Sequence, residues 1–92
     1  MATYVMLGKY SLEGLKGISA KRSDEARALI KQYGGELKVV YALLGEVDLV
    51  GIVELPDTAR AMQTSAALTN LLGVDFTTAP ALTLEEFDKL MG

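Results

Sequence analysis

The sequence predicts an α+β fold in which a four-stranded antiparallel sheet carries both long helices on one face, followed by a short C-terminal helix. Two observations predict it. Segments rich in β-branched and aromatic residues alternate with helical patterns in the order β-α-β-β-α-β, the ferredoxin-like arrangement. The two middle strand segments also follow each other through a short glycine-containing loop, as in a hairpin. The chain has 92 residues, half of them apolar, so we expect one domain over residues 1–92.

The first third of the chain predicts a strand, a helical turn and a long helix. Residues 3–10, TYVMLGKY, have strand composition, and Leu12, Leu15 and Ile18 follow at helical spacing. The next segment, SDEARALIKQYGG, has the periodicity of a helix. We expect Ser23 to be its N-cap and the glycine pair at 34–35 to end it.

Residues 36–44 and 48–55 predict the hairpin, with Gly45, Glu46 and Val47 as its loop. The sequence from Asp57 then predicts a second long helix, with Asp57 as N-cap and Gly73 as terminator. The expected inner face of this helix is made by Met62, Ala66, Leu68 and Leu72.

A last strand is expected over residues 74–82. The segment TLEEFDKLM follows it, and its Thr83 and Glu86 have the spacing of a capping box. The sequence therefore predicts a short tail helix after the sheet.

The strands are apolar on both faces, whereas a sheet with one wet face would alternate apolar and polar residues. In the first strand we expect Val5 and Leu7 to face one side of the sheet and Tyr4 and Met6 the other. In the second strand the two sets are Leu37, Val39, Tyr41 and Leu43, and Lys38, Val40, Ala42 and Leu44. In the third strand they are Leu49 and Val53, and Val50 and Ile52. A bare face of four strands covers roughly 400 Å², near the largest apolar patch that a monomer exposes. We therefore expect a homodimer, or a higher assembly, joined sheet to sheet.

Composition removes many classes of function. The chain has no cysteine and no histidine, so thiolate catalysis, histidine general bases and the usual zinc sites are absent, and we expect no metal and no cofactor. Its net charge is −3 and the third strand has no aromatic residue, which disfavours nucleic-acid binding. No apolar run approaches the length of a membrane span and no export signal opens the chain, so we expect a cytoplasmic protein with no membrane partner.

Three groups of residues are candidates for a site. Glu46 and Asp48 are spaced to share a face of an extended segment, although both also suit a turn, and Asp48 is the stronger candidate. Tyr4, Tyr10 and Tyr41 are candidates for lining a cleft between the sheet and a partner, with core packing as the alternative. A candidate anion site near the start of the first long helix consists of Lys16, Lys21, Arg22 and Ser23, with a solvated charge cluster as the alternative.

Four segments resemble a known family: YVMLGKYSLEGLKGI, KRSDEARALIKQYGGEL, YALLGEVDLVGIVELPD and TTAPALTLEEF. They are similar to the GYD-domain family of small bacterial and archaeal proteins, named for a glycine, a tyrosine and an aspartate in the hairpin. These align with Gly45, Val47 and Asp48, so valine stands at the tyrosine position. The resemblance implies a ferredoxin-like chain of the dimeric α/β-barrel group and no assigned activity.

Three functions remain open from the sequence. The first is a self-associating, noncatalytic module that binds a small molecule or serves in regulation. The second is a cofactor-independent enzyme, similar to a monooxygenase or an isomerase, acting on small phenolic or quinol compounds, with Asp48 or a tyrosine moving a proton. The third is a structural assembly subunit.

Overall fold

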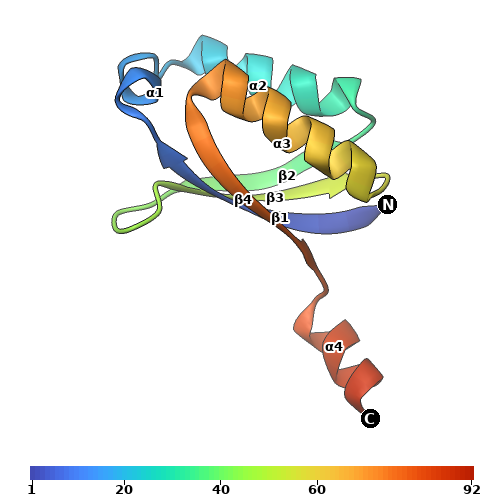
Figure 1. Cartoon of the computed structure of the whole chain (residues 1–92). Helices are drawn as coiled ribbons and strands as arrows, with labels where there is room; N and C mark the ends of the chain where they lie inside the picture. Colours follow the sequence, from blue (N-terminus) through green and yellow to red (C-terminus); the bar gives the residue numbers. More distant parts are fainter.

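The protein was analysed as a computed structural model that describes all 92 residues (Figure 1). Its elements confirm the predicted β-α-β-β-α-β order with a short early helix and a tail helix. They are β1 Ala2–Tyr10, α1 Leu12–Lys16, α2 Ala20–Gln32, β2 Glu36–Ala42, β3 Leu49–Leu55, α3 Thr58–Leu72, β4 Val74–Ala81 and α4 Leu84–Met91. None of the helices has the length and apolar character needed to cross a membrane.

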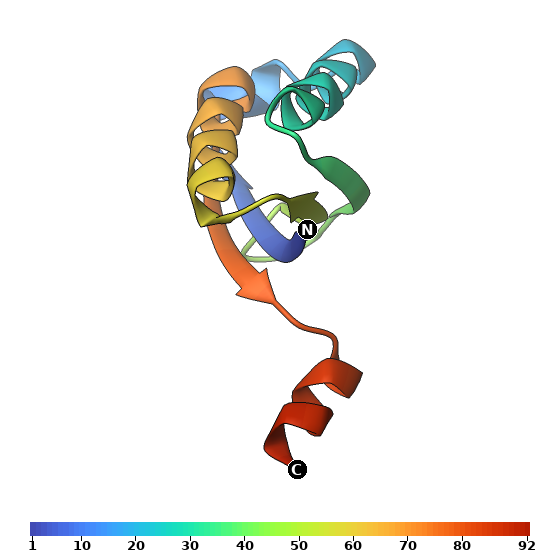
Figure 2. The same cartoon turned by 90° about the vertical axis from the view of Figure 1, so that its right-hand side faces the viewer.

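The four strands form one antiparallel sheet in the order β2-β3-β1-β4. Helices α2 and α3 cover one face, and α4 extends away on the other side (Figures 1 and 2). The core lies between α2, α3 and the covered face. Its larger buried apolar side chains include Tyr4, Met6, Ile30, Val53, Leu55 and Leu68.

Helix α2 begins earlier than the sequence predicted. Its N-cap is Ser19, which has the extended backbone that a cap requires and whose hydroxyl accepts a hydrogen bond from Arg22 N at 3.2 Å. Ser23 lies in the first turn, and its hydroxyl donates to the Ser19 carbonyl oxygen at 3.4 Å. The prediction of Ser23 as N-cap was wrong because two serines four residues apart both suit a cap, and the backbone takes the extended form at the first of them.

A β-bulge changes the alternation along β2. Leu37 is paired with Val53 and Val39 with Ile52, so the register shifts between Leu37 and Val39. Leu37 and Val40 therefore face the helices while Val39 faces away, which corrects the predicted two-residue alternation. The two strands of the hairpin are also shorter than expected, and its loop is longer, because the loop comprises residues 43–48.

Helix α3 has Asp57 as N-cap and ends at Gly73, which is left-handed at φ 66°, as predicted. Its buried face was predicted in part, since Leu68 is buried and Leu72 packs against the core, but Ala66 and Met62 are exposed. Ala61 and Thr64 are buried, whereas Met62 is 70% exposed. Thr64 satisfies its hydroxyl within the helix, donating to the Arg60 carbonyl oxygen at 2.7 Å, which lets a polar residue take a core position.

The capping box of α4 is present as predicted. The Glu86 carboxylate accepts from Thr83 N at 3.0 Å, and Glu86 N donates to the Thr83 hydroxyl at 3.1 Å. Hydrogen bonds from the backbone and side chain of Thr83 lower the pKa of Glu86. The box gives α4 a defined start although no residue of the helix is buried.

The face of the sheet opposite α2 and α3 is uncovered and apolar, and we call it the open sheet face. Cross-strand pairing aligns its side chains in rows, with Ile52 beside Val5 and Val39, and Val50 beside Leu7 and Tyr41. Its apolar members are Val5, Leu7, Val39, Tyr41, Val50, Ile52 and Ala79. The expectation of two apolar faces is thus met in the central strands β1 and β3.

Candidate functional site

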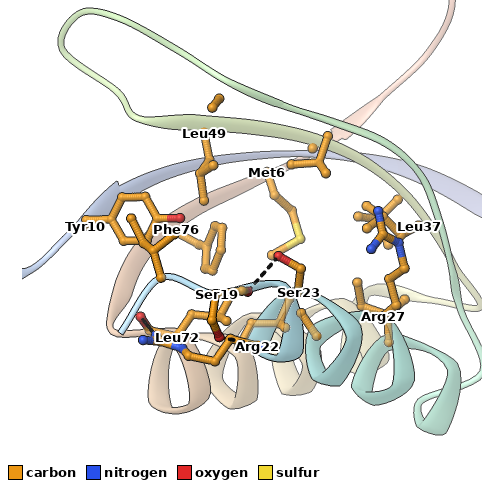
Figure 3. A pocket seen from close by; sticks show the side chains of 18 residues that line it. Met6, Tyr10, Ser19, Arg22, Ser23, Arg27, Leu37, Leu49, Leu72 and Phe76 are labelled. Carbon is orange, nitrogen blue, oxygen red and sulfur yellow. Dashed lines mark hydrogen bonds between the residues drawn. The ribbon is translucent and has the colours of Figure 1, made fainter. Parts of the chain in front are cut away.

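A cavity of about 300 Å³ lies between α2 and the covered face of the sheet (Figure 3). Thirteen of its eighteen lining residues are hydrophobic. The lining comprises Met6, Tyr10, Ile18, Ser19, Arg22, Ser23, Ala26, Arg27, Ile30, Leu37, Val40, Ala42, Leu49, Gly51, Val53, Leu68, Leu72 and Phe76. Its size and apolar character are those of a small-molecule site.

Small residues on opposing walls leave this space open. Gly51 lies in the middle of β3, and a Cβ added there would approach Leu37 and Val40 no closer than 3.9 Å. On the opposite wall α2 presents Ala26. At Gly8 there is no such space, because an added Cβ would lie only 2.8 Å from the ring of Phe76 on β4. The cavity is therefore bounded by Phe76 on the β4 side, whereas space remains beside Gly51.

The exposed lining residues mark the mouth of the cavity between α2 and the edge strand β2. Ile18 and Val40 are 58% and 42% exposed, and Arg27 is exposed on α2. The only charged side chains in the lining are Arg22 and Arg27. A cavity that carries two cations and no carboxylate favours an anionic group on its ligand.

Arg22 links α2 to α1 and α3 through hydrogen bonds from its guanidinium. Its guanidinium donates to the Leu72 carbonyl oxygen at the end of α3 and to the Gly14 carbonyl oxygen of α1 at 3.4 Å. A cation at the C-terminal carbonyls of a helix is favourable for the helix dipole. The Arg22 Nε atom is buried and has no hydrogen-bond partner.

Asp48 joins the hairpin loop to the end of β1. Its Oδ2 accepts from Tyr10 N at 2.9 Å, its backbone N donates to the Gly8 carbonyl oxygen at 2.8 Å, and its carbonyl oxygen accepts from Leu43 N at 2.8 Å. Glu46 is exposed at the loop tip. The two carboxylates therefore differ in role, and Asp48 sets the position of the strand end that presents Tyr10 to the cavity.

Asp48→Ala is expected to lower the free energy of unfolding by about 1–3 kcal/mol, because the part-buried Tyr10 N–H loses its acceptor. Asp48→Asn keeps an acceptor oxygen and should cost less. Glu46→Ala, in the same loop, should leave stability within about 0.5 kcal/mol of the native value. Urea unfolding of the three variants checks this, and equal losses for Asp48→Ala and Glu46→Ala would contradict the assignment.

The structure brings together Tyr10, Arg22 and Ser23 from the candidate residues, all of which line the cavity. The other candidates lie elsewhere. Tyr4 faces α3, with its hydroxyl 3.5 Å from the Thr58 hydroxyl. Tyr41 lies on the open sheet face, so the three tyrosines do not share one cleft.

The two lysines of the candidate anion site, Lys16 and Lys21, are exposed and do not line the cavity. Sequence reasoning missed Gly51, Phe76 and Arg27. Arg27 carried a usable signal, since it lies one turn beyond Ser23 on the same helix.

Comparison with known proteins gives a family and a fold. The model of the GYD domain matches residues 4–91. A search of the curated proteins finds no match. The fold is similar to that of the leucine response regulatory protein LrpA of Mycobacterium tuberculosis, with a TM-score of 0.59 and 13% identity over 89% of this chain and 51% of that one.

A second solved structure, that of a glutamate-to-alanine mutant, is similar to the same degree, with a TM-score of 0.59 and 13% identity over 89% of this chain and 50% of the other. The chain thus spans about half the length of the structures it matches. At this identity the likeness shows the fold alone. The family match over nearly the whole chain shows that the protein belongs to the GYD domain family.

Proposed function

We propose that the protein is a self-associating, noncatalytic module that binds a small apolar carboxylate in the cavity beneath α2. The cavity itself is the observation that supports this most strongly. Its walls would bury an aliphatic or aromatic body, and removing such a body from water contributes about 25 cal/mol per Å². Arg27 at the mouth, whose Nη1 lies 3.8 Å from Asp24 Oδ1 in a weak surface ion pair, would exchange this partner for the ligand carboxylate.

A short aliphatic acid is within the size that a cavity of about 300 Å³ can hold. An amino acid such as leucine would also bring an ammonium group, for which the lining has no carboxylate. The lining suits short fatty acids and aryl acetates equally well. We therefore propose a class of ligand, small apolar carboxylates, and not a single compound.

Self-association is supported by the open sheet face. Its apolar side chains, Val5, Leu7, Val39, Tyr41, Val50 and Ile52 among them, lie together with no element of the same chain over them. Covering the face with a second copy would remove this apolar area from water. A two-fold sheet-to-sheet dimer does so with one surface used twice.

The alternatives of enzyme and assembly subunit receive less support from the cavity. A proton-transfer reaction needs a base within hydrogen-bond reach of the ligand. Tyr10 is the one phenol in the lining, and the carboxylate of Asp48 is occupied by Tyr10 N. A purely structural subunit would have no use for an open apolar cavity with a cationic mouth.

Arg27→Ala is expected to weaken octanoate binding about tenfold, because a charge-assisted hydrogen bond at the mouth is lost. Binding of 1-octanol, which has no charge, should be unchanged. Lys31→Ala removes an exposed cation one turn further along α2, outside the cavity, and is the matched control. Isothermal titration calorimetry measures all combinations, and equal effects of the two variants on octanoate, or no octanoate binding to the native protein, would contradict the proposal.

A further inference from the structure

Helix α4 is a second apolar surface without a partner. Leu84, Phe87, Leu90 and Met91 lie along it at helical spacing and are all exposed, Leu84 at 74%. The helix extends from the end of β4 toward the side of the open sheet face, away from α2 and α3 (Figures 1 and 2). Nothing in its own chain covers the apolar side of α4.

We infer that α4 of one protomer packs against α2 and β2 of a second protomer and closes the mouth of its ligand cavity. The inference rests on the self-association proposed above. The apolar side of the partner's α4 covers the mouth of the cavity. Each complete site is then built from two chains.

The same chain cannot supply this cover. α4 follows β4, and the cavity opens beside β2, which is the opposite edge of the sheet. The sheet itself also separates them, because α2 lies on the covered face and α4 on the other side. A contact between α4 and the mouth must therefore form between protomers.

Sheet order determines what a two-fold dimer can bring together. With the order β2-β3-β1-β4, a two-fold axis parallel to the strands places β4 of one protomer over β2 of the other. Facing sheets are about 10 Å apart. The two residues before α4 and its eight residues span up to about 19 Å, so the last turn of α4, with Leu90 and Met91, can pass the partner's sheet and reach the gap between its β2 and α2.

Charge favours this arrangement. α4 carries three carboxylates and one lysine, whereas α2 carries four cations and two carboxylates. In the alternative two-fold arrangement β4 lies over β4, and the two tail helices of like net charge would lie together. Helices of opposite net charge attract, and one of the four cations of α2, Arg27, lies at the mouth itself.

Interface size also favours a contribution from α4. The open sheet face supplies a footprint of roughly 400 Å², while a stable interface needs about 600–1,000 Å² per partner. A helix about 12 Å long and 10 Å wide covers roughly 120 Å². Each protomer would gain this twice, once through its own α4 and once where the partner's α4 lies, which brings the footprint into that range.

Disulfide trapping tests the inference cleanly because the native chain has no cysteine. Single-cysteine full-length chains carrying Val40→Cys or Ser23→Cys at the mouth are mixed with chains carrying Leu90→Cys or Met91→Cys in the last turn of α4. Met62→Cys, exposed on the outer side of α3, replaces the mouth position in the control mixture. We expect at least one mouth mixture to form covalent heterodimers about tenfold faster than the control, since a disulfide requires Cα atoms within about 7 Å.

Light scattering on the same samples separates the two levels of the proposal. A dimer in which neither mouth position is trapped above the control, or in which α4 positions trap only each other, overturns the inference and leaves self-association standing. A monomeric native protein overturns both. Preferential trapping in a dimer supports the inference.

Discussion

Ile52→Lys is expected to convert the protein from a dimer to a monomer. Ile52 is at the centre of the open sheet face, between Val5 and Val39 on the neighbouring strands. A lysine there would be buried without a partner in the dimer, at a cost of roughly 3–5 kcal/mol for each uncompensated charge. Two-fold symmetry puts two such charges in one interface, so the dissociation constant should rise by several orders of magnitude.

The monomer should keep its fold, because the lysine points to solvent once the partner has left. Sedimentation velocity at micromolar concentration gives the assembly state and circular dichroism gives the secondary structure. Met62→Lys introduces the same charge on the exposed side of α3 and should leave the assembly unchanged. A folded Ile52→Lys dimer would show that the open sheet face is not the interface.

Gly51→Val is expected to weaken octanoate binding about tenfold to hundredfold while keeping or raising stability. The glycine lines the cavity, and a Cβ there meets only ordinary contacts at 3.9 Å. Valine in a strand interior is favoured over glycine by roughly 1 kcal/mol. The added methyl groups occupy the ligand's volume, and forcing a ligand into a filled site should cost 1–3 kcal/mol, about a tenfold to hundredfold loss of affinity.

Calorimetric binding and thermal unfolding measured together distinguish filling of the cavity from damage to the fold. Gly51→Ala should have an intermediate effect on affinity. Thr77→Val introduces valine on β4 facing away from the cavity and should leave octanoate affinity unchanged. Native affinity in a stable Gly51→Val protein would place the ligand elsewhere.

The sequence predicted the element order because its signals are local. Helix α3 begins after the N-cap Asp57 and ends at the C-cap Gly73, and α4 begins at the capping box formed by Thr83 and Glu86. The bulge in β2 could not be predicted, since it depends on pairing with β3 and residues 37–44 are apolar at almost every position. Two serines of equal capping quality made the start of α2 ambiguous.

The candidate site was predictable only in part. Tyr10 and Asp48 were identified, but the cavity arises from side chains that are small or absent at Gly51 and Ala26, which no motif reveals. The role of Arg22 depends on the Leu72 carbonyl oxygen, fifty residues away in the chain. Long-range contacts of this kind have no signature in a single sequence.

Chemical-shift mapping with octanoate tests the central claim most directly. In ¹H–¹⁵N spectra of the native protein, titration should shift the amides of Gly51 and Arg27, which line the cavity. The amides of Tyr41 and Thr77, which lie on the opposite face, should move least. Saturable shifts confined to the cavity are the expected result, and shifts centred on the open sheet face, or none at all, would contradict the account.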